Sequence, residues 1–448
     1  MHRPHCAVVV LGHTGHGKTS LVDALRGQPG PARRINDADV KVVRCSTSNK
    51  RYTLFDVPGG PRSLHAALRA TPMADVAVLV VSSIAGPQAF TREHLLAAKG
   101  MGVQHIVVVI NDHDGDRTLL DACELEVRSL LSEHGEAGDE AAIIVASLRD
   151  DVVRAAAEVF AVLDATAHRF YDDEADACLR VLFRHPGLSA PNVHGRELAV
   201  SSGQLAAGTL RVGDAVRVVG DRAALTPLFF HSPASQQRAA RDPNIYGRGP
   251  GWVGPTYTPP AYVPPPRGQL ERLARIEQLQ VARRDVDVVT AGEQVGVQLS
   301  FAAAVPRVDR FTSVIVRADH PDPAQVVLTT LTLRPSAIGG PRRRIDTARN
   351  IVVWSGAYAT LAVMLLLDEH RRDVDSVGPD STFLVAIVLS APRFIGVGQA
   401  LVVASNVGVF ATGVVAEVVG AADAAAWFAR LFEIRAARDA RRAPALFA

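Results

Sequence analysis

The sequence predicts an α/β domain with a doubly wound, mostly parallel sheet, followed by two antiparallel β-barrel domains. Three observations support this fold class. A short β-branched run, CAVVVLG, leads into a glycine-rich loop and then into a segment whose apolar residues have helical spacing. Further β-branched strands alternate with helical segments in the N-terminal part of the chain. After this part, short strands are separated by glycines, which is typical of barrels.

The 448 residues are enough for about two to four domains. We expect the α/β domain over residues 1–172, one barrel over 177–302, a second barrel over 305–420, and an amphipathic helix with a tail over 421–448. An insertion rich in proline, glycine and tyrosine interrupts the first barrel at about 222–270. This composition predicts polyproline II or irregular structure. The insertion is either a solvated loop or an arm whose aromatic and arginine side chains bind a partner.

The loop GHTGHGKTS matches the pattern G-x-x-x-x-G-K-[ST] between a predicted strand and a predicted helix, which is the context in which this pattern binds phosphate. Its glycines let backbone N–H groups surround the phosphates, and the helix N-terminus adds a partial positive charge. Lys18 is expected to reach the β- and γ-phosphates, and Thr19 to ligate Mg²⁺. The predicted phosphate-binding residues are Gly12, His13, Gly15, His16, Gly17, Lys18, Thr19 and Ser20.

A second strand, RYTLFDVPGG, ends at Asp56. In this architecture such an aspartate holds Mg²⁺ through a water, and the Gly59 N–H senses the γ-phosphate. Thr19 and Asp56 are therefore the predicted metal-site residues. The alternative is a strand that ends in an ordinary Pro-Gly turn.

A later strand, HIVVVIND, begins an Asn-x-x-Asp pattern that predicts guanine recognition. Asn111 would steady the loop, and the Asp114 carboxylate would accept hydrogen bonds from the base N1 and N2 groups. Ser147, after the strand IIVAS, would close over the base. GTP or GDP with Mg²⁺ is thus the expected ligand.

Composition limits where the protein works and what it binds. The net charge of +2 gives no overall field toward nucleic acid. The four cysteines are scattered without CxxC spacing, which favours a reducing compartment. The apolar run at the N-terminus is too short for a signal peptide, so we expect a cytoplasmic protein. Residues 351–367 lack charge, but a serine, a glycine and a threonine interrupt them, which favours two buried strands over a membrane span.

Together these segments resemble the translational GTPase family of elongation factor Tu and the selenocysteine-specific elongation factor. The stretches GHTGHGKTSLVDAL, DVPG, GPQAFTREHLLAAKGMGVQHIVVVIND and ELEVRSLLSEHG resemble the family's G domain. Looser likeness over 194–220, 284–300 and 383–419 implies its two barrel domains. The resemblance implies guanine-nucleotide binding, and aminoacyl-tRNA or the ribosome as partners.

The chain departs from the family pattern where hydrolysis is controlled. The family's D-x-P-G-H motif supplies a histidine that positions the hydrolytic water, and this chain has Gly60 instead, so no catalytic residue is intact. Asp37 stands at the position of the first-switch threonine and would repel a γ-phosphate unless Mg²⁺ lies between them. The family's phosphate-loop V-D becomes Thr14-Gly15, which removes an acidic group near the phosphates. The N-K-x-D lysine becomes Asp112, which predicts weaker affinity. Whether the protein is an enzyme is therefore open.

Two functions remain in view at this stage. The first is a carrier of aminoacyl-tRNA in which His13, His16 or His65 replaces the missing histidine or hydrolysis is slow. The second is a non-hydrolysing regulator or scaffold that binds a protein partner through the 222–270 insertion or the C-terminal helix. That helix has Trp427, Leu431 and Ile434 on one face, and it either packs on its own barrel or binds a partner.

Overall fold

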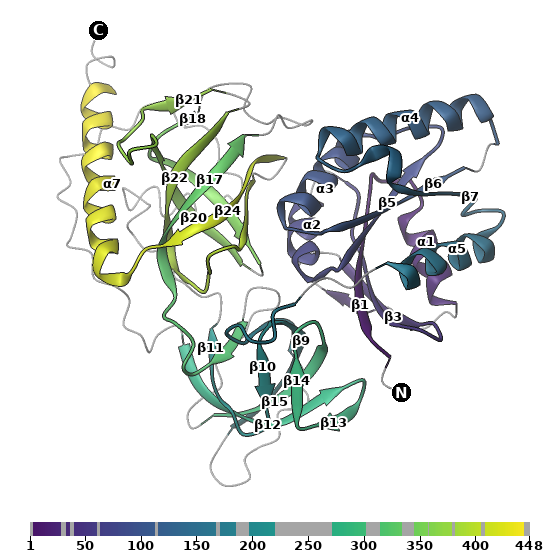
Figure 1. The fold of residues 1–448 in the computed structure, drawn as a ribbon, viewed down its shortest axis with the longest axis horizontal. Coiled ribbons are helices and arrows are strands. Elements are labelled where there is room, and N and C mark those ends of the chain that lie inside the picture. Colours follow the sequence, from purple (N-terminus) through teal and green to yellow (C-terminus); the bar gives the residue numbers. More distant parts are fainter. Residues whose placement is uncertain are drawn as a thin grey trace.

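The structure is a computed structural model with three bodies, an α/β domain and two barrels (Figure 1). It describes residues 3–27, 33–35, 40–60, 63–112, 115–166, 171–184, 197–219, 271–301, 314–333, 345–356, 358–378, 381–404 and 408–442. Asp37, Asp114 and the 222–270 insertion, all named above, lie outside these ranges.

The α/β domain contains a seven-stranded sheet in the order β2-β3-β4-β1-β5-β6-β7. The strands from β4 to β7 are parallel in this order, whereas β3 runs antiparallel to β4. Their bounds are β1 His5–Leu11, β2 Arg33–Ile35, β3 Val40–Ser46, β4 Arg51–Asp56, β5 Val76–Ser82, β6 His105–Asn111 and β7 Ala142–Ala146. The β-branched runs of β1 and β5 are buried along their whole length, as central parallel strands require.

Helices cover both faces of this sheet. One apolar cluster joins the sheet to α1 and α5, and a second joins its other face to α2, α3 and α4. The helices are α1 Lys18–Arg26, α2 Leu64–Ala70, α3 Ala89–Gly100, α4 Arg117–Glu133 and α5 Val152–Ala165, with 3₁₀ turns η1 Thr71–Met73 and η2 Gly138–Glu140. The domain is therefore doubly wound, as the sequence predicts.

The second body is an antiparallel barrel whose ring is closed by the pairing of β11 with β12. The strand order is β11-β16-β8-β9-β15-β12-β13, and β10 pairs with β14 beside it. The bounds are β8 Cys178–Arg184, β9 Glu197–Ala207, β10 Thr209–Arg211, β11 Ala215–Val219, β12 Glu271–Val281, β13 Arg284–Val286, β14 Val288–Thr290, β15 Gln294–Phe301 and β16 Val314–Arg317. Because β16 pairs with β8 and β11, we propose that the boundary between the barrels lies after Arg317 and not near residue 305.

The third body is a closed barrel in the order β17-β22-β20-β19-β23-β24, with a small β18–β21 pair. The bounds are β17 Ala324–Leu333, β18 Ile345–Asp346, β19 Arg349–Ser355, β20 Tyr358–Leu367, β21 Ser376–Val377, β22 Thr382–Arg393, β23 Ala400–Ala404 and β24 Val409–Val418. The uncharged stretch 351–367 forms the antiparallel pair β19–β20, as predicted. Among the described residues, no helix has both the length and the apolarity that a bilayer span needs. The α/β domain followed by two barrels confirms the predicted fold class.

The last helix, α7 (Ala421–Arg442), lies along the outside of this third barrel (Figure 1). Phe428 and Leu431 are each only 2% exposed and share an apolar cluster with barrel residues such as Val363 and Val388. The apolar face of the helix therefore packs on its own barrel. A partner of this helix would have to contact its outer, polar face.

The α/β domain contacts the third barrel through α2 and α3, which lie on the side that faces this barrel in Figure 1. Trp354 is buried between the two bodies, and the His65 ring stacks against it with 5.2 Å between ring centroids. The Glu93 carboxylate is fully buried and accepts a hydrogen bond from the Val409 N–H at 2.8 Å. The helix that follows Gly60 is thus packed against a barrel.

Candidate functional site

A cavity of about 660 Å³ opens at the carboxyl ends of β1 and β4. This volume is in the range of small-molecule sites, and the carboxyl edge of a parallel sheet is where such folds bind ligands. Its lining comes from three segments that are distant in sequence: Thr14, Gly15, Gly17, Lys18, Thr19, Ser20, Lys41, Asp56, Val57, Pro58, Gly59 and Gly60.

The glycines of the loop have backbone conformations that require glycine. Gly12, Gly15 and Gly17 have φ of 133°, 83° and 103°. A side chain on Gly12 would overlap the Val80 carbonyl, and one on Gly17 would lie 2.8 Å from the Asn111 amide nitrogen. The loop therefore winds tightly around the N-terminus of α1, whose unpaired N–H groups favour an anion.

Lys18 lies at the base of the loop and is only 6% exposed. Its ammonium donates to the His13 carbonyl at 2.7 Å, and burial lowers its pKa to about 8 against the opposing effect of Asp56. Gly59 comes so close that a Cβ there would overlap the Lys18 Nζ, and the Gly59 carbonyl accepts from the Thr14 N–H at 3.1 Å. The loop and the segment after Asp56 thus touch directly.

Thr19 and Asp56 meet in the cavity, because the Thr19 hydroxyl donates to Asp56 Oδ2 at 2.9 Å. A hydroxyl and a carboxylate are oxygen ligands of the kind that Mg²⁺ prefers, and Mg²⁺ needs few protein ligands when phosphates and waters supply the rest. The donor set therefore fits the predicted metal. A lysine that the sequence interpretation missed also lies here, since the Lys41 Nζ is 3.5 Å from the same Asp56 oxygen.

Gly60 lies on the cavity wall, where the family pattern has its histidine. A Cβ at Gly60 would meet only the Thr14 Oγ1, at 3.5 Å. None of the three substitute histidines is among the described residues that line the cavity. The His65 ring packs on Trp354, and the buried His16 accepts a hydrogen bond from the Ser82 N–H at 3.3 Å, with a pKa lowered to about 4 by burial.

His94 is a second residue that the sequence did not indicate, although it lies within the stretch GPQAFTREHLLAAKGMGVQHIVVVIND, which resembles the family's G domain. This fully buried histidine of α3 accepts from the Gly12 N–H through Nδ1 at 3.2 Å, and its Nε2 lies 3.0 Å from the Ser63 hydroxyl. Ser63 in turn donates to the Gly60 carbonyl, which assigns the proton of His94 to Nε2. His94 therefore ties the phosphate loop to the start of α2.

Asn111 connects the predicted base site to the phosphate loop. Its amide donates to the His16 carbonyl at 3.2 Å, and its oxygen accepts from the Leu148 N–H at 3.0 Å. Asp112, at the family's lysine position, accepts from the Ser83 hydroxyl at 2.9 Å. Asn111 therefore bridges the phosphate loop and the segment after β7, whereas Asp112 bonds to Ser83, just after the neighbouring strand β5.

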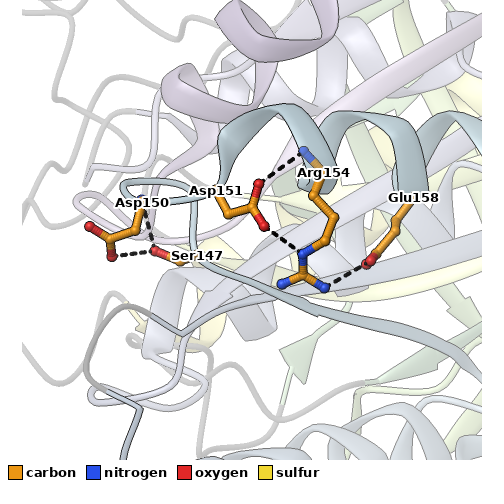
Figure 2. A network of polar contacts seen from close by, with 5 residues as sticks. All are labelled: Ser147, Asp150, Asp151, Arg154 and Glu158. Carbon is orange, nitrogen blue, oxygen red and sulfur yellow. Dashed lines mark hydrogen bonds and ion pairs between the residues drawn. The ribbon is translucent and has the colours of Figure 1, made fainter.

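Ser147 lies in the loop between β7 and α5 (Figure 2). Its hydroxyl donates to Asp150 at 2.7 Å and accepts from the Asp150 N–H at 3.0 Å, which makes a tight local turn. Asp151 then caps α5 and pairs with Arg154, which also pairs with Glu158. These contacts hold the Leu148 backbone against Asn111.

Comparisons with known proteins show similarity to translation elongation factors. The family model of the elongation factor Tu GTP binding domain matches residues 32–170, a range that begins after the phosphate loop. Elongation factor Tu 2 of Streptomyces avermitilis is 33% identical over 240 residues. The match covers 49% of this chain and 61% of that protein, so the chain spans less than two thirds of the relative's length.

Two solved structures share the fold. Translation elongation factor SelB from Methanococcus maripaludis, in complex with the GTP analogue GppNHp, has a TM-score of 0.64 at 17% identity, covering 95% of this chain and 81% of that one. A bacterial selenocysteine-specific elongation factor, EF-Sec, has a TM-score of 0.62 at 18% identity, covering 92% and 58%. At these identities the likeness is evidence for the fold alone.

The matched domain is similar to the GTP-binding domain of elongation factor Tu, and the fold is shared with elongation factors of the SelB type. The chain thus resembles elongation factor Tu and SelB, as its motifs predict.

Proposed function

We propose that this chain binds GTP and GDP in the cavity between the phosphate loop and the segment after Asp56. The observation that carries the proposal is the convergence of Lys18, Thr19 and Asp56 on one cavity whose lining includes Gly15 and Gly17, both with positive φ. Lys18 would contact the β- and γ-phosphates, and the backbone N–H groups of Gly15 to Ser20 would surround them. Mg²⁺ held by Thr19 and Asp56 would neutralise phosphate charge.

Hydrolysis by this site is proposed to be slow or absent. Gly60 has no side chain to position a water, and no histidine lines the described part of the cavity. A positioned general base contributes roughly 10²–10⁴-fold to rate, so its absence leaves a binding site with little turnover. The nucleotide would then act as a bound effector.

A titration with fluorescent GTP and GDP in Mg²⁺, with ATP as competitor, tests the binding proposal. We expect saturation at micromolar nucleotide that ATP does not reverse, and loss of binding in Lys18→Ala. Binding that ATP competes equally well would reject guanine selection by Asn111 and Asp114. Absence of binding at millimolar nucleotide would reject the site.

The cellular role that we propose is a cytoplasmic member of the translation-factor class that binds aminoacyl-tRNA or the ribosome. Its support is the likeness to elongation factor Tu 2 and to SelB and EF-Sec, which are elongation factors. Retention of aminoacyl-tRNA on the immobilised protein should increase when GppNHp replaces GDP. If tRNA is not retained, or is retained equally in both states, the carrier role fails.

The alternative role is a non-hydrolysing scaffold for a protein partner, and Gly60 is the observation that favours it. The apolar face of α7 is already used by its own barrel, which leaves the 222–270 insertion and the outer face of α7 for a partner. Nucleotide binding without tRNA binding, combined with capture of a specific protein by the full chain but not by a chain lacking 222–270, would support this role.

A further inference from the structure

Lys41 is held in the nucleotide cavity by the pairing of two strands. It lies directly opposite Asp56 in the antiparallel β3–β4 ladder. Side chains at directly opposed positions lie on the same face of a sheet, so this register directs the lysine toward the aspartate. Its Nζ is 3.5 Å from Asp56 Oδ2, and both residues line the cavity. The strand register therefore fixes Lys41 in the lining of the cavity.

The ammonium shares its carboxylate oxygen with the predicted metal ligand. Thr19 donates to Asp56 Oδ2 at 2.9 Å, the same oxygen that faces Lys41. Asp56 is 5% exposed and Lys41 is 27% exposed, so the carboxylate is buried while the ammonium end retains access to the cavity. The Asp56 oxygen that is predicted to bind Mg²⁺ therefore already faces the positive charge of Lys41.

This arrangement changes the charge that a nucleotide meets. In a site with only Lys18 and Asp56, the two charges cancel, and the phosphates depend on Mg²⁺ for neutralisation. Lys41 compensates Asp56 and leaves the charge of Lys18 uncancelled. A lysine also carries three donors on a flexible stem, so it can contact a phosphate oxygen without leaving the neighbourhood of Asp56.

Resting on the nucleotide site described above, we propose that Lys41 acts as an internal cation for the phosphates, so that the protein retains guanine nucleotide when Mg²⁺ is removed. The ligand class is a nucleoside diphosphate or triphosphate whose phosphate charge is met by two lysines. Mg²⁺ adds affinity to this site without being required for binding.

Equilibrium titration with fluorescent GDP in excess Mg²⁺ and again in EDTA tests the proposal. For the unaltered protein we expect the dissociation constant to rise by less than about tenfold in EDTA. For Lys41→Gln we expect a further loss in EDTA of about 10–100-fold, the usual size of one charge-assisted hydrogen bond. The loss in Mg²⁺ should be smaller, because the metal then supplies the charge.

Two control variants separate charge from folding. Lys41→Arg keeps the charge and should keep EDTA-resistant binding. Lys99→Gln removes a lysine of nearly equal exposure, 28% against 27%, that pairs with Glu136. Lys99 is not among the described residues that line the cavity, so this variant should change neither dissociation constant. If Lys41→Gln does not fold, the unaltered protein alone tests the proposal. A loss of about 100-fold or more in its affinity for GDP in EDTA would overturn the proposal.

The outcomes distinguish this inference from the binding proposal. Tight binding in Mg²⁺ with equal losses in EDTA for the unaltered protein and Lys41→Gln would overturn the role of Lys41 and leave the nucleotide site intact. Absence of binding in both conditions would overturn both. If Lys41→Gln loses affinity for GDP in EDTA only, and Lys41→Arg does not, the role of Lys41 as an internal cation is supported.

Discussion

Gly60 is the residue on which the question of hydrolysis depends. It lies on the cavity wall, and a Cβ there would make only an ordinary contact with Thr14 Oγ1 at 3.5 Å. Its neighbour Gly59 has no such room, since a Cβ would overlap the Lys18 ammonium and the loop backbone. The two adjacent glycines therefore have different structural requirements.

Gly60→His should raise single-turnover GTP hydrolysis. A Cβ at this position has room, and an imidazole beyond it would be able to position a water. Such a group is worth about 10²–10⁴-fold when well placed. We expect a gain of at least about tenfold, measured by the conversion of bound GTP to GDP. Gly59→Ala should instead abolish nucleotide binding. If Gly60→His binds GTP normally but hydrolyses it no faster, the missing histidine is not what limits turnover.

The burial of His94 leads us to expect that the protein loses stability in mild acid. Burial lowers its pKa to about 3, while in the unfolded chain it takes up a proton near pH 6.5. Because the unfolded state binds the extra proton between these values, the free energy of unfolding falls as pH decreases below about 6.5, by up to about 2 kcal/mol at pH 5 from this residue. Denaturant unfolding at pH 7.5 and 5.0 measures the slope.

His94→Gln supplies the comparison for this slope. A glutamine can accept from the Gly12 N–H and donate to Ser63 without titrating. The variant should lose part of the acid sensitivity while keeping most of its stability at pH 7.5. An unchanged slope would assign the acid sensitivity to other groups.

For the individual helices and strands, the spacing of apolar residues and the turn residues predict most of the fold. The run CAVVVLG is β1, the uncharged stretch 351–367 is the β19–β20 pair, and the amphipathic C-terminal segment is α7. Pairing between distant strands is what local patterns do not encode. For this reason the sequence did not indicate Lys41, whose position depends on the β3–β4 register, or the pairing of β16 with β11 from which we propose a later domain boundary.

The packing of α7 on its barrel gives a stability prediction. Phe428 is 2% exposed in the cluster between helix and barrel, so Phe428→Ala should lower the free energy of unfolding of the full chain by about 3–5 kcal/mol. Glu433→Ala, at an exposed position of the same helix, should change it by less than about 0.5 kcal/mol. Equal effects in the two variants would mean that the helix does not depend on this face.

Across the whole molecule, the cavity beside the phosphate loop is connected to the third barrel through α2 and α3. His94 joins the phosphate loop to Ser63 at the start of α2, and the neighbouring Glu93 bonds to Val409 of the barrel. The motifs predicted the cavity from the sequence, because each lies at a strand end. The residues that couple the cavity to the barrel carry no local motif, and only the packed structure identifies them.

We propose that the protein holds guanine nucleotide and hydrolyses it slowly or not at all. The most direct test loads the full chain with GTP in Mg²⁺, removes free nucleotide, and identifies the bound nucleotide by chromatography over several hours. We expect GTP to be recovered throughout. Rapid recovery as GDP would show a working GTPase despite Gly60, and recovery of no nucleotide would contradict the site itself.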